Sequence, residues 1–314
     1  MNRRAIDATV VIPTHNPSER ILIRVLESLK AQSLGPECWE VIIIDNCSER
    51  PVADFPLPQL LNLTIKRERK LGLTNARLAG IEEANGHIIV FLDDDNLPAA
   101  DYLSQAVHFM GKHPEVGVLG GRIVGEFASP PRAWVRPHLG QLALRDLGQD
   151  LLISNHPRHQ PLQTYDYFAP YGAGLVVQAA VAKSYKKSAA ENHLLADRTG
   201  NHLGGCGDCE IVMRALLDGY QCAYSPALNL THVIPPGRLR FKYLLRLARD
   251  GQYSWGNFCV RHGFAGGLTL FQARLRQAKA FFTKRGWTRA GFISWQRTCG
   301  YLEGLCRGTP PQLL

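Results

Sequence analysis

The sequence lacks any long apolar run, although apolar residues make up 45% of its 314 positions. A transmembrane helix needs about 18 or more such residues in succession, so we expect no membrane span. The segment before the first apolar run, residues 1–7, does not resemble a secretory signal. The eight cysteines are scattered, without the compact spacing of a disulfide framework. These absences favour a globular protein of a reducing compartment, which we expect to be cytoplasmic.

Acidic residues are scarce in the last quarter of the chain. From Arg238 to the end there are 14 Lys or Arg and 2 Asp or Glu, whereas the rest has 22 and 25 (36 − 14 and 27 − 2). A basic region on a mildly acidic body predicts attraction to phospholipid head groups, a phosphorylated lipid or nucleic acid. Because no nucleic-acid-binding module is recognisable there, we expect peripheral contact with an anionic inner membrane face and no nucleic-acid partner.

Two phosphate-binding motifs are also missing. The chain has no G-x-x-x-x-G-K-[ST], and no G-x-G-x-x-G opens its first predicted helix. The phosphates of a nucleotide would therefore be held through a metal ion or by basic side chains such as those of residues 66–70, although a basic loop of this kind is more often solvated. A sugar nucleotidyltransferase, one alternative function, would begin with a Gly-rich loop, which residues 13–17 do not resemble. The other alternative is a non-catalytic nucleotide- or nucleic-acid-binding relative, which the basic C-terminal region favours.

Apolar runs and amphipathic segments alternate in the first hundred residues. Strands are predicted at 9–13, 40–45, 63–66 and 87–92, and helices at 18–32 and 73–84. This alternation predicts an α/β fold with a mostly parallel, doubly wound sheet. The segment 127–167 is expected to be an irregular insertion. Later elements are a turn and strand over 171–178, helices at 208–219, 241–250 and 268–284, and a short strand at 221–225.

The first, second and fourth predicted strands each end in polar residues. These ends are Thr14-His15-Asn16, Asp45-Asn46 and Asp93-Asp94-Asp95. Ligands of open α/β sheets bind outside the carboxyl ends of the strands, so we expect the three loops to share one crevice.

Three adjacent carboxylates need a cation or hydrogen-bond donors, because neighbouring negative charges raise one another's pKa. Their hard oxygen atoms suit Mg²⁺ or Mn²⁺, and such an ion commonly completes its shell with substrate phosphates. Asp93, Asp94 and Asp95 therefore predict a divalent-metal and diphosphate site. A solvated acidic turn or a helix N-cap explains the triplet about equally well.

Several motifs together resemble the family 2 glycosyltransferases, which have the GT-A fold. The resemblance runs from about residue 8 to 235. Its motifs are Val10 to Asn16, Asp45 to Ser48, Gly72 to Arg77, Phe91 to Asn96 and Gly207 to Arg214, followed by Gly219-Tyr220 and His232. It implies a GT-A-type, mostly parallel nucleotide-binding sheet flanked by helices, with a helical C-terminal appendage. It also implies an inverting transfer of a sugar from a nucleotide-diphosphate donor to an acceptor hydroxyl.

The resemblance assigns the donor site residue by residue. Asp45 resembles the carboxylate that reads the nucleobase, and Arg77 the basic residue beside the base. The loop that holds the nucleoside corresponds to Pro13, Thr14 and Asn16. Asp93 and Asp95 match the ends of the family's D-x-D motif. The resemblance implies that Asp95 binds the metal, with Asp93 as a further candidate ligand. Asp93 and Asp94 would contact ribose and water. His232 is a candidate third metal ligand, or an ordinary structural histidine.

Asp208 lies where the family carries its general base. An acceptor hydroxyl becomes a good nucleophile when a positioned carboxylate takes its proton, so this role suits the chemistry. The structural alternative is that Asp208 caps its helix while Glu210 pairs with Arg214. The family usually has an acid where this chain has Gly207. Gly172 and Gly174 would allow the backbone to approach the donor sugar closely, or form a tight turn.

The acceptor is expected to be a saccharide or a lipid-linked building block of polysaccharide or glycolipid synthesis. Aromatic side chains between Trp134 and Tyr171 could stack on it, or belong to the core. We divide the chain into a catalytic domain, 1–235, and a basic helical region, 236–314. The donor half of the domain would be about 1–125 and the acceptor half about 126–235.

Two further features leave alternatives open. The helix from Leu268 has an apolar face with a basic border, which is typical of a membrane-surface helix but also of a helix docked on the protein. Cys206-Gly-Asp-Cys209 is formally C-x-x-C, with His202 and Cys222 as conceivable zinc partners, but two unrelated thiols are the favoured interpretation.

Overall fold

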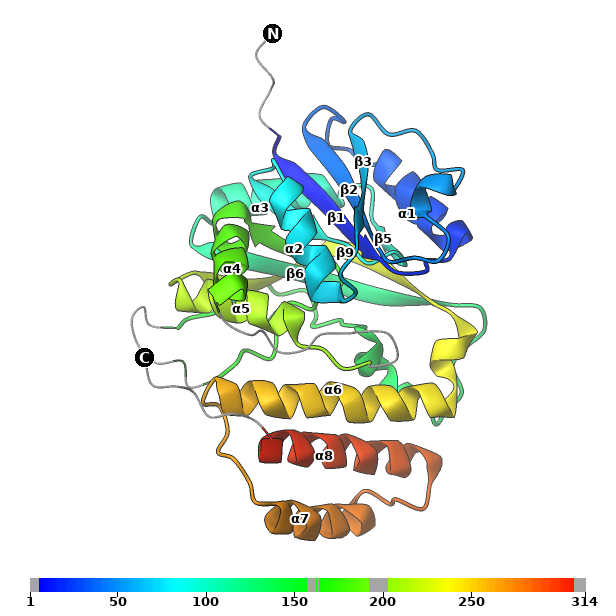
Figure 1. The fold of residues 1–314 in the computed structure, drawn as a ribbon, viewed down its shortest axis with the longest axis vertical. Helices are drawn as coiled ribbons and strands as arrows, with labels where there is room; N and C mark the ends of the chain where they lie inside the picture. Colours follow the sequence, from blue (N-terminus) through cyan, green and yellow to red (C-terminus); the bar gives the residue numbers. More distant parts are fainter. Residues whose placement is uncertain (1–5, 157–161, 163, 192–202, 308–314) are drawn as a thin grey trace.

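The computed structural model describes residues 6–156, 162, 164–191 and 203–307. The nine strands in these residues form one sheet in the order β3-β2-β1-β4-β8-β6-β9-β5, with β7 paired to β9 (Figure 1). The strands are β1 Ala8–Thr14, β2 Trp39–Asn46, β3 Leu63–Glu68, β4 Ile88–Phe91, β5 Asn96–Pro98, β6 Val116–Phe127, β7 Leu152–Ile153, β8 Leu175–Gln178 and β9 Gln221–Ile234. His202 lies outside the described residues.

Strands β3, β2, β1 and β4 pair in parallel, as do β6 and β9. Strand β8 is antiparallel to both of its neighbours, β4 and β6. The sheet is therefore mixed but mostly parallel. The carboxyl ends of β1, β2 and β4 meet at one edge, where the polar loops predicted from the sequence begin.

Helices cover both faces of the sheet, as the strand sequences require. Val10 and Ile12 of β1 pack toward α1 (Glu19–Lys30) and α3 (Tyr102–Lys112). Val11 points to the other face, where α2 (Leu73–Glu83), α4 (Ala179–Glu191) and α5 (Gly207–Leu217) pack. Alternate residues of a strand point to opposite faces, so an unbroken apolar run belongs in a strand buried on both sides.

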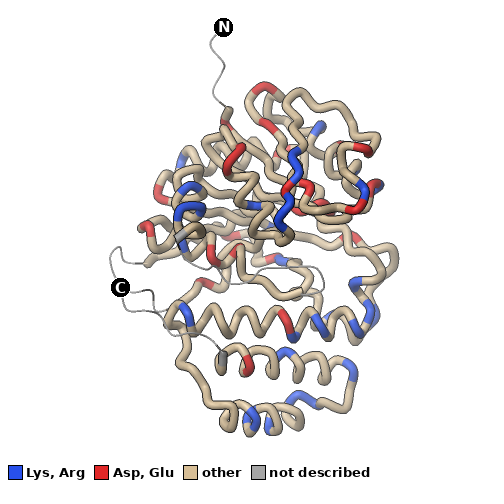
Figure 2. The backbone as a smooth tube through the Cα atoms, in the orientation of Figure 1, with Lys and Arg blue, Asp and Glu red and all other residues tan. Residues whose placement is uncertain are grey.

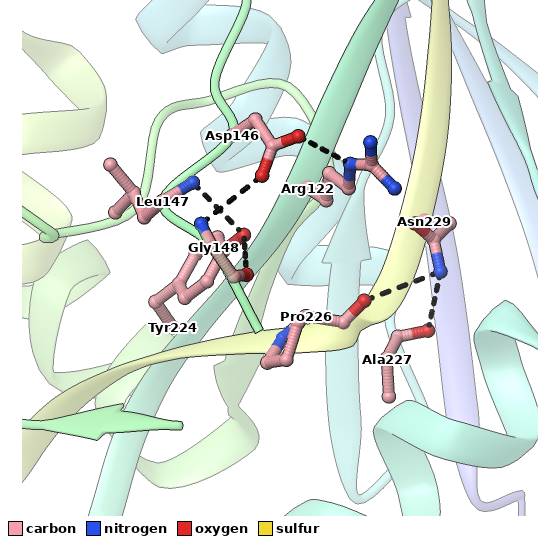
Figure 3. A network of polar contacts seen from close by, with 8 residues as sticks. All are labelled: Arg122, Asp146, Leu147, Gly148, Tyr224, Pro226, Ala227 and Asn229. Atoms are coloured by element: carbon pink, nitrogen blue, oxygen red, sulfur yellow. Dashed lines mark hydrogen bonds and ion pairs between the residues drawn. The ribbon is translucent and has the colours of Figure 1, made fainter. Parts of the chain in front are cut away.

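Strand β9 contains a bulge that the sequence did not predict. Gly121 of β6 pairs with Ser225 and the next residue, Arg122, pairs with Asn229. Three residues of β9 thus bulge out, and Asn229 holds them by donating to the carbonyl oxygens of Pro226 and Ala227, each at 3.3 Å (Figure 3). Beyond the bulge, β9 continues toward β5. A bulge bends its strand, and here it brings the second half of β9 to the functional edge of the sheet.

The C-terminal residues form three helices stacked below the sheet: α6 (Phe241–Arg261), α8 (Arg289–Arg307) and, outermost, α7 (Leu270–Thr283) (Figure 1). Three short 3₁₀ helices, η1 (Val52–Asp54), η2 (Arg136–Leu142) and η3 (Pro236–Leu239), complete the described elements. Helix α6 extends well past the predicted end at residue 250, and α8 was not predicted. The strand β6 was also missed, and β9 is much longer than the predicted 221–225.

Candidate active site

A cavity of about 230 Å³ lies at the carboxyl ends of β1, β2 and β4. Its walls include Thr14 and His15 after β1, Asn46 at the end of β2 and the Asp triplet after β4. Hydrogen bonds connect these loops to one another: His15 Nδ1 lies 2.7 Å from the Asn46 carbonyl, and the Thr14 hydroxyl donates to Asp94. The three predicted polar loops thus surround one crevice.

The Asp triplet lines this cavity in a turn, with Asp93 and Asp94 partly exposed and Asp95 buried. Asp95 is 5% exposed, and burial, together with the charge of Asp95, raises the pKa of Asp94 to about 7. The residues that follow form β5, and the cap of the next helix, α3, is Asp101. The helix N-cap alternative is therefore wrong, whereas the metal-binding role of the triplet stays a prediction.

Asp95 contacts groups on the distant strand β9 and helix η3. One carboxylate oxygen, Oδ1, accepts from Asn96 Nδ2 at 3.0 Å and lies 3.3 Å from His232 Nε2. The other, Oδ2, lies 2.8 Å from Arg238 Nη2. Arg238 also contacts His232 Nε2 at 3.0 Å. Since His232 pairs directly with Asn96 across β5 and β9, the bulged strand explains why it reaches Asp95.

The residues present fit a divalent ion that is held mainly by the substrate. Within the described ranges, no group of three or more His, Cys, Asp or Glu side chains is placed to hold a metal. Mg²⁺ and Mn²⁺ nevertheless bind through one or two carboxylates when phosphate oxygens and water complete the shell. Asp95 and His232 are the nearest pair for this purpose, and Asp93 lines the same cavity. Arg238 contacts both of these residues, at Asp95 Oδ2 and His232 Nε2, so it would compete with such an ion for them.

Two donor-site candidates shape the loops instead of lining the cavity. The carboxylate of Asp45 accepts the backbone N–H groups of Ser48 at 3.0 Å and Val52 at 3.2 Å, and the residue is 2% exposed. Asn16 has a left-handed backbone (φ 52°) and accepts from the Glu49 N–H at 2.8 Å through its side chain. Pro13 and Thr14 do line the cavity. Base reading by Asp45 stays a prediction.

Arg77, Gly172 and Asp208 form a second group beside the cavity. The Asp208 carboxylate accepts the Gly172 N–H at 2.8 Å and the Cys209 N–H at 2.9 Å. A Cβ on Gly172 would lie 2.4 Å from Arg77 Nη2, so a side chain at this position would require the Arg77 guanidinium to shift. Gly174 has a φ of +72°, and its carbonyl accepts from the Tyr102 hydroxyl at 2.6 Å. Asp208 is not among the cavity-lining residues that the structure describes.

The structural alternative for Asp208 is contradicted. Helix α5 begins at Gly207 with Cys206 as its cap, so Asp208 does not cap it. Arg214 pairs with Asp218 and not with Glu210. Glu210 instead lies 3.1 Å from His262 Nε2 of α6.

The predicted aromatic residues divide into two groups. Tyr165 packs edge-on against Trp255 and Phe258, and Phe168 is buried, so both are core residues. Tyr167 and Tyr171 are 74% and 37% exposed, and both are close in sequence to Gly172. Tyr167 remains available to a sugar ring, whereas the Arg145 guanidinium covers one face of the Tyr171 ring, 3.6 Å from its centroid.

The basic loop and the cysteine pair have structural contacts. Lys66 pairs with Glu83, and Arg67 donates to the Ser48 carbonyl at 2.9 Å. A hydrogen bond between the Cys209 thiol and Cys206, together with burial, holds the pKa of the Cys209 thiol well above its usual range. A protonated thiol is a poor nucleophile and metal ligand, which supports the interpretation as unrelated thiols.

The sequence did not predict that residues of the C-terminal region line part of the cavity. Arg238, Tyr243 and Leu247 line the cavity together with Gln141, Leu142 and Ala143. Arg238 is the first residue of the basic C-terminal quarter, but nothing local shows that it meets Asp95. The domain boundary predicted at 235 stays a prediction, and residues on both of its sides form the site.

Comparisons with known proteins agree with this architecture. Residues 9–192 match the family described as Glycosyl transferase family 2. Poly(ribitol-phosphate) beta-N-acetylglucosaminyltransferase TarS of Staphylococcus aureus is 28% identical over 117 residues, which are 33% of this chain and 19% of TarS. Succinoglycan biosynthesis protein ExoW of Rhizobium meliloti is 33% identical over 108 residues, 32% of this chain and 33% of ExoW. The matches thus span well under half of these relatives.

The crystal structure of S. aureus TarS 1–349 has a TM-score of 0.51 and 16% identity, covering 95% of this chain and 90% of that one. This likeness confirms the predicted fold, a mostly parallel α/β sheet of the GT-A type with C-terminal helices. Because the family model matches residues 9–192, more than half of the chain, this protein belongs to glycosyl transferase family 2.

Proposed function

We propose that this chain is an inverting glycosyltransferase that moves a sugar from a nucleoside-diphosphate donor to an acceptor hydroxyl with the help of Mn²⁺ or Mg²⁺. The observation that carries the proposal is the cavity at the strand ends, where Asp95 meets His232 and Arg238 beside Thr14 and Asp94. Ligands of open α/β sheets bind at this edge. Hard oxygen atoms and a guanidinium suit a diphosphate and its metal.

The cavity residues around Asp95 would bind the donor diphosphate, and Asp208 would act on the acceptor. When bound between Asp95 and His232, a divalent ion would neutralise the charge of the departing diphosphate. Asp208 would take the proton of the acceptor hydroxyl while the new C–O bond forms and the sugar–phosphate bond breaks. Two backbone N–H groups hold the Asp208 carboxylate, and each of its oxygens keeps a lone pair for that proton. Because the acceptor displaces the diphosphate in one step, the configuration of the attacked sugar carbon would be inverted.

The acceptor side of the proposal rests on the exposed aromatic residues and on the relatives. Tyr167 is largely exposed, and Tyr171 has one ring face that Arg145 does not cover. The printed names of TarS and ExoW refer to poly(ribitol-phosphate) and succinoglycan. We infer a saccharide or lipid-linked acceptor in polysaccharide or glycolipid synthesis. All eight cysteines are free thiols, which supports a cytoplasmic setting.

Isothermal titration of UDP, GDP and TDP, with and without Mn²⁺, tests the donor site. We expect one nucleotide to bind in a metal-dependent manner, and Asp95→Ala to abolish this binding while Asp208→Asn keeps it. Failure of all three nucleotides to bind the folded protein would overturn the proposal. Binding that survives Asp95→Ala would remove Asp95 from the metal site but leave the nucleotide site intact.

A further inference from the structure

Helix α7 contacts the rest of the protein through its less apolar face. The buried residues of this helix are Ala273, Gln277 and Ala280. The carbonyl of Gln277 accepts from the Trp295 indole of α8 at 2.9 Å. Helix α7 is also the outermost layer of the C-terminal stack (Figure 1). The apolar face read from the sequence is therefore not the face that docks on the protein.

That apolar face is exposed. Five large apolar side chains between residues 270 and 287 have exposed fractions of 58–73%: Leu270, Phe271, Leu275, Phe282 and Trp287. At 3.6 residues per turn, Phe271, Leu275 and Phe282 fall within roughly 40° of arc. Singly exposed apolar residues are ordinary on protein surfaces, but a contiguous group of this size marks an interaction surface.

Positive charge borders the same face. At 3.6 residues per turn, Arg274 lies on one side of the apolar stripe and Lys279 on the other, and Lys284 and Arg285 follow at the end of the helix. Figure 2 shows that basic positions recur along this lowest part of the chain. Between Asp250 and Glu303 the sequence has no acidic residue and eight Lys or Arg. The partner that complements an apolar stripe with this border is apolar inside and negatively charged at its surface.

We propose that α7 and the turn to Trp287 form a membrane-binding surface, which we call the α7 surface, that inserts its aromatic and leucine side chains among anionic phospholipids. An anionic bilayer combines acyl chains with negative head groups, and amphipathic helices with basic borders lie in this interface. Within the described residues no helix is long and apolar enough to cross a membrane, so the contact is peripheral. The inference does not depend on the proposed transferase reaction.

Vesicle flotation with the full chain tests the α7 surface. The protein is expected to float with vesicles of phosphatidylcholine and phosphatidylglycerol but not with phosphatidylcholine alone, and to release at about 1 M salt, where the screening length is about 3 Å. Phe271→Ser with Phe282→Ser should weaken binding at least about tenfold. Lys279→Glu with Lys284→Glu should weaken it at least about twentyfold, because each basic side chain near an anionic surface contributes about fivefold.

Matched control variants test whether the loss of vesicle binding is specific to the α7 surface or follows from any loss of exposed apolar side chains or positive charge. Leu61→Ser with Leu217→Ser removes two exposed apolar side chains elsewhere, and Lys30→Glu with Lys112→Glu makes the same charge change on other helices. Both should float like the wild type. Brominated lipids should quench fluorescence in the wild type and much less in Trp287→Phe, since the Trp287 ring is 66% exposed on this surface.

Two results would overturn the inference. The first is a folded protein that does not bind anionic vesicles at low salt, or binds them equally well in both α7 double variants. The second is a dimer in analytical ultracentrifugation that Phe271→Ser with Phe282→Ser converts to a monomer, because the surface would then belong to a second copy.

Discussion

The Asp95 carboxylate pairs with Arg238, a residue far along the chain. Asp95 follows β4 in the first third of the sequence, and Arg238 lies 143 positions later (238 − 95). The Asp95 side chain is 7% exposed and that of Arg238 is 30% exposed, so solvent screens this pair only in part. A metal ion and a guanidinium therefore compete for the same carboxylate.

Arg238→Ala should consequently strengthen Mn²⁺ binding in the absence of nucleotide. We expect about a fivefold gain, which corresponds to roughly 1 kcal/mol for a partly exposed ion pair. Titration of Mn²⁺ followed by electron paramagnetic resonance of the free ion measures it. Arg240→Ala, two residues further on and in the wall of a different cavity, is the matched control. An unchanged affinity in Arg238→Ala would show that the guanidinium does not compete with the ion.

Asp208→Asn should lower the transfer rate by about 10²–10⁴-fold, the usual contribution of general base catalysis. The amide oxygen can still accept the Gly172 N–H, so the local backbone should stay in place. Turnover with the donor identified by titration gives the rate, and nucleotide affinity serves as the check on folding. Asp218→Asn, in an exposed pair at the end of the same helix, should keep nearly full activity. Equal losses in both variants would point to a structural cause.

At the residue scale, the sequence predicted that Thr14 and the Asp triplet lie at one crevice, and all four residues line the cavity. They are at or just after the ends of the apolar strands β1 and β4, which are easy to recognise, while their roles stay predictions. Arg238 was not predicted as part of the site. Its position depends on the bulge in β9 and on η3, and neither has a local signal strong enough to reveal a contact so far along the chain.

At the scale of elements, the first four strands and the helices α1 and α2 were predicted to within about two residues, whereas α3 and α4 were not predicted. Unbroken β-branched runs mark β1, β2 and β4, and Asn85-Gly86 marks the turn after α2. Strands β6 and β9 were missed or shortened because Gly120, Gly121 and Pro226 interrupt their patterns. Glycine is poor in strand interiors and proline is confined to bulges or edges, so tertiary pairing determines these two strands.

The pairing of α6 with α8 relies on close backbone contact. A Cβ on Gly256 of α6 would lie 2.5 Å from the Tyr301 carbonyl oxygen and 3.0 Å from the Cα of Gly304. The many glycine and polar residues of α8 weaken its helical pattern, which explains why the sequence did not predict it. The same glycines allow the two helices to approach.

Gly256→Ala should therefore lower the free energy of unfolding by about 1–3 kcal/mol, the usual cost of overpacking. Urea denaturation followed by circular dichroism measures it. Gly251→Ala on the same helix meets no atom within 4 Å, so it should stabilise the protein by up to about 1 kcal/mol through helix propensity. A stabilised Gly256→Ala variant would mean that the two helices separate easily.

At the scale of the whole molecule, the C-terminal helices and the sheet share one apolar cluster. Leu244 and Leu247 of α6 pack with Val135, Leu142 and Ile234, and Leu247 also lines the cavity. Separating the helices from the sheet would expose this cluster and open the site. The two parts are thus coupled energetically, although the sequence suggested an appendage.

Calorimetry should accordingly show one unfolding transition, with calorimetric and van't Hoff enthalpies in agreement. Gly256→Ala should lower its midpoint as a whole, and the nucleotide with Mn²⁺ should raise it. Two resolved transitions, only one of which responds to Gly256→Ala, would show that the helices unfold independently of the sheet.

The stacking order of α6, α8 and α7 has a geometric consequence (Figure 1). The cavity is lined by α6, and the exposed apolar stripe is on α7, two helix layers away. With about 8–10 Å between packed helix axes, the layers hold the reaction centre at least about 16–20 Å from any surface that α7 rests on. The reacting hydroxyl of an acceptor anchored in that surface would have to lie at the same distance from the surface as the cavity does. The thickness of the helical stack would therefore select acceptors by length.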